Sequence, residues 1–258
     1  MNITERWISP AILAFAFAVN AFHNHTALGA ALGGIPGLYP IVFFVGVGTV
    51  LPGLVLGRAV RRAPAAARSL GVTLGWRDAI AILAALVIGG ALAASPLAPI
   101  LGQPGGTRRV LTLFAQLLVA STAEVGLFLG VMAVGLRAWL GDRGDWRSGL
   151  LLIVVSSLVF GLFHFTYPTP WNTLGTATTV TAVWVGVSTL FVVSRSLVAA
   201  VLFDNMMATM GFATRGLTLP MSPTTGVAIA VLAIAAFIVA FSLARRGGSP
   251  SHIGAAKG

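Results

Sequence analysis

Runs of about twenty apolar residues recur along this whole sequence, and they limit what the chain can fold into more than any other feature. A helix needs about 20 such residues to cross the hydrocarbon of a bilayer. Only 9% of the residues are charged, whereas a soluble domain carries about 25%. We therefore predict an all-α polytopic membrane protein with about eight transmembrane helices in one bundle.

The boundaries of the apolar runs give the expected order of the spans. They lie at about residues 9–31, 38–58, 78–95, 110–137, 148–166, 175–194, 196–213 and 223–244. The sixth and seventh runs are joined so closely, at "SRS", that they are expected to form a hairpin. We expect residues 1–247 to form a single transmembrane helical domain. Residues 248–258, polar and glycine-rich, are expected to be a disordered cytoplasmic tail.

The basic residues indicate an orientation rather than a nucleic-acid partner. The formal charge is +10, but the Arg and Lys side chains sit between the apolar runs and form no stripe. The two termini and alternate connections carry thirteen of them, and the opposite connections carry three. The positive-inside rule then places both termini in the cytoplasm. We expect an integral protein of a prokaryotic plasma membrane, with the lipid bilayer as a partner and no nucleic acid.

A few ionisable side chains lie inside the apolar runs, where each costs roughly 2.5–3.5 kcal/mol and usually faces a cavity or a partner. They are Glu124 in the fourth run, His164 in the fifth and Asp204, followed by Asn205, in the seventh. One interpretation is that they bond to one another and fix helix packing. The interpretation we favour is catalytic. A desolvated carboxylate accepts a proton from water, and an imidazole and an amide stabilise an oxyanion.

The connection after the fifth run, "TYPTPWN", is stiffened by two prolines and carries two interfacial aromatic residues. Tyr167 and Trp171 are typical of the aromatic belt that anchors a protein at the membrane surface. A second interpretation makes this loop the rim of a site, with Asn172 facing inward.

These residues resemble the motifs of the CPBP family (CAAX prenyl protease and bacteriocin-processing, Abi-type), which are intramembrane glutamic proteases. In "AEVGLFLG" the residues Glu124, Phe128 and Gly130 match the family's Glu, Phe and Gly, and "FGLFH" holds its Phe-x-x-x-His as Phe160 and His164. In "SLVAAVLFDN", Asp204 takes the place of a His, and Asn205 follows. The matching core spans about residues 110–212. Val125 and Leu129 stand where the family pattern has a second Glu and an Arg.

The resemblance implies an intramembrane endopeptidase that acts on a membrane-embedded peptide or protein. Glu124 would activate water, and His164 and Asn205 would stabilise the oxyanion. Asp204 belongs to the same catalytic set and would share a proton with Glu124. We expect Phe128, Phe160, Trp171 and Asn172 to contact the substrate.

Other hypotheses stay open at this point. Val125, Leu129 and Asp204 are also compatible with a catalytically inactive scaffold that binds membrane partners, and intramembrane acids with a histidine can relay protons in a small transporter. No cofactor is expected. A metal bound by Glu124, His164 and Asp204 is not favoured, because zinc prefers more histidines. His23 and His25 would supply them only if the first helix lay beside the site.

Overall fold

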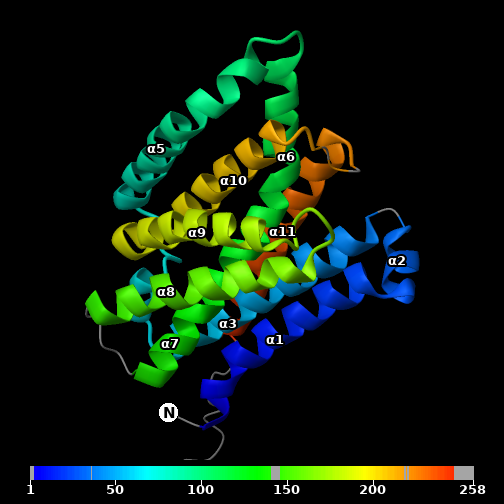
Figure 1. Ribbon diagram of the computed structural model, residues 1–258. Helices are drawn as coiled ribbons and strands as arrows, with labels where there is room; N and C mark the ends of the chain where they lie inside the picture. Colours follow the sequence, from blue (N-terminus) through cyan, green and yellow to red (C-terminus); the bar gives the residue numbers. More distant parts are fainter. Residues whose placement is uncertain (1–2, 36, 141–145, 218, 220, 247–258) are drawn as a thin grey trace, which may run out of the picture.

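The computed structural model describes residues 3–35, 37–140, 146–217, 219 and 221–246, and every regular element among them is a helix (Figure 1). The elements are α1 (Ile3–His25), α2 (Ala27–Gly33), η1 (Pro40–Val50), α3 (Leu51–Arg62), α4 (Ala66–Ser69), α5 (Trp76–Leu101), α6 (Gly106–Val125), η2 (Gly126–Val131), α7 (Met132–Leu140), α8 (Trp146–Phe163), η3 (His164–Thr166), α9 (Leu174–Ser194), α10 (Leu197–Thr214) and α11 (Pro223–Arg246).

Seven helices of the described chain are long and apolar enough to cross a membrane. They are Pro40–Arg62, Trp76–Leu101, Gly106–Leu140, Trp146–Thr166, Leu174–Ser194, Leu197–Thr214 and Pro223–Arg246. These correspond in order to the second to eighth predicted runs, so the chain is an all-α polytopic membrane protein. The predicted hairpin of the sixth and seventh runs is also present, as α9 and α10 joined through Arg195 and Ser196.

The first predicted run, 9–31, is wrong at its C-terminal boundary. Helix α1 ends at His25, because the Thr26 hydroxyl accepts a hydrogen bond from the backbone N–H of Gly29 and starts a new helix. Helix α2 packs back against the end of α1: a Cβ on Gly29 would lie 2.2 Å from the carbonyl oxygen of Phe22. Helix α1, with 23 residues, is longer than several of the seven spans but is not among them, and its last turn carries His23 and His25.

The basic segments meet at one end of the bundle. Three contacts tie them together: Trp139 Nε1 donates to Arg6 O (3.1 Å), Arg137 Nη1 donates to Ser69 Oγ (2.6 Å) and Leu197 N donates to Gly71 O (3.4 Å). Helix α11 also ends there, beside the end of α3, where a Cβ on Gly57 would meet Phe241 and Ala244. Both ends of the described chain therefore lie at this end, which we call the basic end. The polar end of α1 lies at the other.

The central element is α6, which packs against α10 and α11 and continues through η2 into α7 (Figure 1). Both η1 and η2 are π-helical, a rare geometry that re-aims side chains and often occurs at functional sites. The two approach closely where α6 gives way to η2. A Cβ on Gly48 would lie 2.2 Å from the Ala123 Cβ, and one on Gly126 would lie 2.9 Å from the Gly48 carbonyl oxygen. This crossing fixes the position of Glu124 and Val125, which lie between Ala123 and Gly126 in the sequence.

Candidate active site

Glu124 occupies the last turn of α6, directly before the π-helical segment η2. The Tyr167 hydroxyl donates a hydrogen bond to Glu124 Oε1 at 3.1 Å. Tyr167 reaches it because α8 ends at Phe163 and one tight 3₁₀ turn, His164–Thr166, carries the chain towards α6. The carboxylate therefore faces the interior of the bundle and is held by a loop from another span.

Both tyrosines of the sequence surround this carboxylate. Tyr39, at the start of η1, lies close enough to Glu124 for an electrostatic interaction, and so does Tyr167. The Tyr39 ring stacks on His23 of α1, with 3.8 Å between ring centroids. Elements far apart in the sequence thus contribute to one polar cluster.

Asp204 of α10 is the second acid of the cluster. Its side chain is 4% exposed, and its carboxyl group interacts electrostatically with that of Glu124. The buried hydroxyl of Ser121, one turn before Glu124 on α6, lies within interaction range of the Asp204 carboxyl group, and neither Asp204 Oδ2 nor Ser121 Oγ has full hydrogen-bond geometry with any described residue. Buried oxygens of this kind commonly bind ordered water.

His164 lies beside Tyr167, and no direct contact with Glu124 is found within the described chain. The ring centroids of His164 and Tyr167 are 5.3 Å apart, and the His164 side chain is 7% exposed. The His164 Nδ1–H donates to the Phe160 carbonyl oxygen at 3.0 Å, since a carbonyl only accepts. In the neutral ring, Nε2 is then an acceptor. It becomes a donor, as an oxyanion requires, only when His164 binds a proton.

The Asn205 side chain is bonded to the backbone of α6 at Phe114 and not to Glu124. Its Nδ2 donates to the carbonyl oxygen of Phe114 at 2.9 Å, about three helical turns before Glu124. Its Oδ1 is buried without a hydrogen-bond partner in the described part of the chain. One amide N–H is thus used in joining α10 to α6.

The predicted substrate-contacting residues fall into two groups. Phe128 and Phe160 are buried and pack edge to face at 5.3 Å, with the Phe160 ring stacked on Trp184 at 3.7 Å. Phe128 and Phe160 therefore belong to the hydrophobic core of the bundle. Trp171 instead stacks on Phe212 at 4.7 Å, at the end of α10. Asn172 accepts from Thr169 Oγ1 at 3.3 Å within its own loop.

A hydrogen-bond network on α1 was not predicted from the sequence. Asn20 Nδ2 donates to Thr166 Oγ1 (2.7 Å), and Asn24 Nδ2 donates to the Thr166 carbonyl (3.0 Å). The Tyr39 hydroxyl donates to Asn20 Oδ1. The network fixes α1 and η1 to the turn that carries Tyr167. Its available signal was the pair of asparagines four residues apart, which places both on one face of an otherwise apolar helix.

The end of α1 does lie beside the cluster, which was the condition for its histidines to join a metal site. Among the described residues, however, no three His, Asp or Glu side chains gather closely enough to hold a metal ion. His23 is engaged instead in stacking on Tyr39.

No family model matches this sequence, and neither a curated protein nor a solved structure is detectably similar to it.

Proposed function

We propose that the protein is an intramembrane endopeptidase of the glutamic type. The observation that carries this proposal is the position of Glu124, an acid inside a membrane bundle that is held by Tyr167 beside a second acid, Asp204. A carboxylate at that depth is costly, and such residues usually serve a function. The substrate class that fits is a peptide segment within the membrane.

In this mechanism, Glu124 removes a proton from a water molecule bound near the Asp204 carboxyl group and the Ser121 hydroxyl. The resulting hydroxide attacks the carbonyl carbon of the scissile peptide and forms a tetrahedral oxyanion. Glu124 then gives its proton to the amide nitrogen as the C–N bond breaks. Tyr167 orients the carboxylate, and the neutral His164, whose Nδ1–H is held by the Phe160 carbonyl, accepts a hydrogen bond from the attacking water at Nε2.

The test uses the purified full chain in detergent with a library of fluorescence-quenched transmembrane peptides. Glu124→Gln and His164→Ala are expected to abolish cleavage while retaining a cooperative thermal transition. Thr178→Ala, at an exposed position of α9 outside the cluster, is the control for folding. Cleavage at the wild-type rate by both Glu124→Gln and His164→Ala would refute the proposal.

A non-catalytic scaffold is the second candidate, and the packing of two residues favours it. Val125 and Leu129 are fully buried apolar side chains, where the resembled family has an acid and an arginine. Under this alternative, Glu124→Gln changes the stability, and no peptide of the library is cut by any variant.

We also propose that the basic end faces the cytoplasm of a prokaryotic cell, as the positive-inside rule requires. The sequence contains no cysteine. A single introduced cysteine is therefore the only thiol that can be labelled, and its labelling shows on which side of the membrane it lies. A cysteine replacing Leu74, near the basic end and exposed, should react with a membrane-impermeant maleimide only after the cells are opened. A cysteine replacing Leu174, exposed at the start of α9, should react in intact cells.

A further inference from the structure

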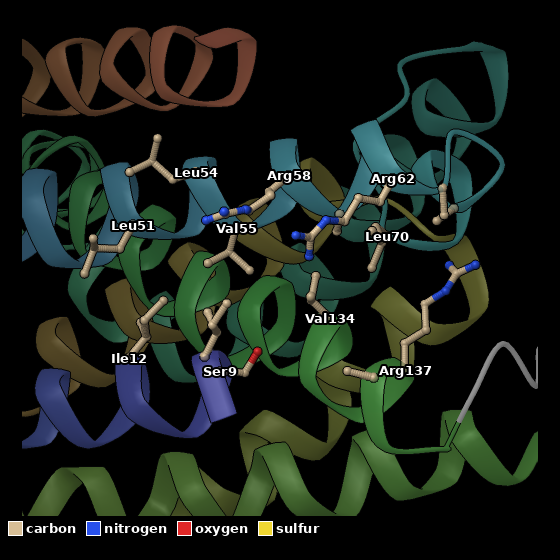
Figure 2. Close-up of a pocket in the computed structure, with 15 residues that line it drawn as sticks. Ser9, Ile12, Leu51, Leu54, Val55, Arg58, Arg62, Leu70, Val134 and Arg137 are labelled. Carbon is tan, nitrogen blue, oxygen red and sulfur yellow. The ribbon is translucent and has the colours of Figure 1, made fainter. Parts of the chain in front are cut away.

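A second site lies at the basic end, away from Glu124. A cavity of about 500 Å³ opens between the first half of α1, the helix α3 and the helix α7 (Figure 2). Its wall is mainly apolar, with Ile8, Ile12, Leu51, Leu54 and Val55 among the lining residues. Leu54 of α3 lines the cavity and is 39% exposed, so the cavity is open on its side.

Among the described residues, every charged side chain that lines the cavity is basic. Arg58 and Arg62, one helical turn apart on α3, and Arg137 of α7 all line it, and the lining contains no acidic residue. Arg58 is exposed, and within the described chain it makes no hydrogen bond or ion pair. Arg137 is held in place by its bond to Ser69. Figure 2 shows the guanidinium groups of Arg58 and Arg62 along the same wall.

A serine of α1 forms the inner side of the cavity. Ser9 of α1 lines the same cavity, is 2% exposed, and its Oγ has no hydrogen-bond partner in the described part of the chain. Ser9 is fixed there by α7, since a Cβ on Gly135 would lie 2.7 Å from the Ser9 Cβ. Its Oγ lies against the same glycine and is shielded from solvent, so Ser9 closes the inner side of the cavity.

We propose that this cavity binds an anionic phospholipid, with the phosphate at Arg58 and Arg62 and an acyl chain along the apolar wall. Basic pockets between transmembrane helices at the membrane surface recognise anionic head groups. The continuous apolar wall selects a lipid over a soluble phosphate, because only a lipid buries a chain there. The site uses no residue of the Glu124 cluster and is therefore independent of the proposed peptidase activity.

The experiment measures lipid binding to the full chain in detergent by native mass spectrometry, with phosphatidylglycerol and phosphatidylcholine of identical acyl chains. Phosphatidylglycerol is expected to bind more tightly. Arg58→Gln should weaken its binding about fivefold, the share of one basic residue near a membrane surface. Arg58→Lys keeps the charge and should retain most of the affinity. Arg62→Gln gives an independent reading if Arg58→Gln does not fold.

The matched control is Arg77→Gln, an arginine at the same end but outside the cavity, where it lies over Trp76. Binding that is weakened equally by Arg77→Gln, or equal for the two lipids, would overturn the proposal in favour of nonspecific surface charge. Competition by glycerol phosphate at the concentration of the lipid would overturn it in favour of a soluble anion.

Discussion

The Tyr167 hydroxyl and the Glu124 carboxylate form a hydrogen bond of 3.1 Å between two spans of the bundle. It couples the end of α8 to the point where α6 turns into the π-helical segment η2. A tyrosine next to a proline at a span boundary is ordinarily a surface anchor. Here the same residue completes the surroundings of the only acid in its span, so Tyr167 is a positioning residue for Glu124.

The first prediction is that Tyr167 and Glu124 are energetically coupled. In a double-mutant cycle of Tyr167→Phe and Glu124→Gln, the coupling free energy should be about 0.6 kcal/mol, the average for hydrogen bonds between membrane helices, and at most about 1.7 kcal/mol. The free energy of unfolding is measured by titration with a denaturing detergent.

The chain's other tyrosine supplies the control for this cycle. Tyr39→Phe makes the same chemical change, but the Tyr39 hydroxyl bonds to Asn20 and not to Glu124. Its coupling to Glu124→Gln should be smaller. Additive effects of Tyr167→Phe and Glu124→Gln would show that the hydrogen bond contributes nothing.

A second prediction concerns Asn20, which accepts from Tyr39 and donates to Thr166. Asn20→Leu keeps the volume but leaves the Tyr39 hydroxyl without its acceptor in the membrane interior. We expect a loss of about 1–3 kcal/mol in the free energy of unfolding. Asn172→Leu, in the loop after η3, should change it by about 0.5 kcal/mol or less. Equal losses for the two variants would contradict a structural role for the α1 network.

Hydropathy was sufficient to predict the spans, because each apolar run must be helical to satisfy its backbone in lipid. It failed at the end of the first run for a local reason. Residues 26–31 are as apolar as a span requires, and only the Thr26 cap and the close approach of Gly29 to Phe22 turn the chain back. Such a turn depends on one hydroxyl and one missing Cβ, which an average over twenty residues does not register.

The candidate site was harder to predict, because a helix that is apolar all round does not reveal its rotation. Helix α10 has apolar residues on every side of Asp204 and Asn205, so the sequence did not determine which of the two faces Glu124. The structure places Asp204 near that carboxylate and directs Asn205 to Phe114. Likewise, the 3₁₀ turn after Phe163, which brings Tyr167 rather than His164 to Glu124, has no signature in the hydrophobic pattern.

The third prediction tests the crossing that positions Glu124. In Gly48→Ala, the new methyl group would lie 2.2 Å from the Ala123 Cβ, so the helices must separate. The cost of such overpacking is about 1–3 kcal/mol. Thermal unfolding in detergent should show the loss, and the double variant Gly48→Ala with Ala123→Gly should recover only part of it, since the new Cβ would still lie 2.9 Å from the Ala123 Cα.

The control for this prediction is a glycine with open space around it. A Cβ on Gly211 of α10 would meet no atom within 4 Å, so Gly211→Ala should be neutral or should stabilise the helix by up to about 1 kcal/mol. If Gly48→Ala is tolerated as well as Gly211→Ala, the close crossing of η1 and α6 is wrong.

The last prediction concerns the turn between α9 and α10, where Arg195 has φ of 56° and ψ of 40°. In this left-handed region a Cβ crowds the following carbonyl oxygen, which costs roughly 1–2 kcal/mol. Glycine avoids that cost, so Arg195→Gly should be more stable than Arg195→Ala by about 1 kcal/mol. Both variants lose the guanidinium, and their difference therefore isolates the backbone. The order should reverse at Val185, an exposed residue in the middle of α9, where Val185→Ala should be more stable than Val185→Gly by about 1 kcal/mol. The same order at both positions, measured by thermal unfolding, would contradict the left-handed turn on which the hairpin of α9 and α10 depends.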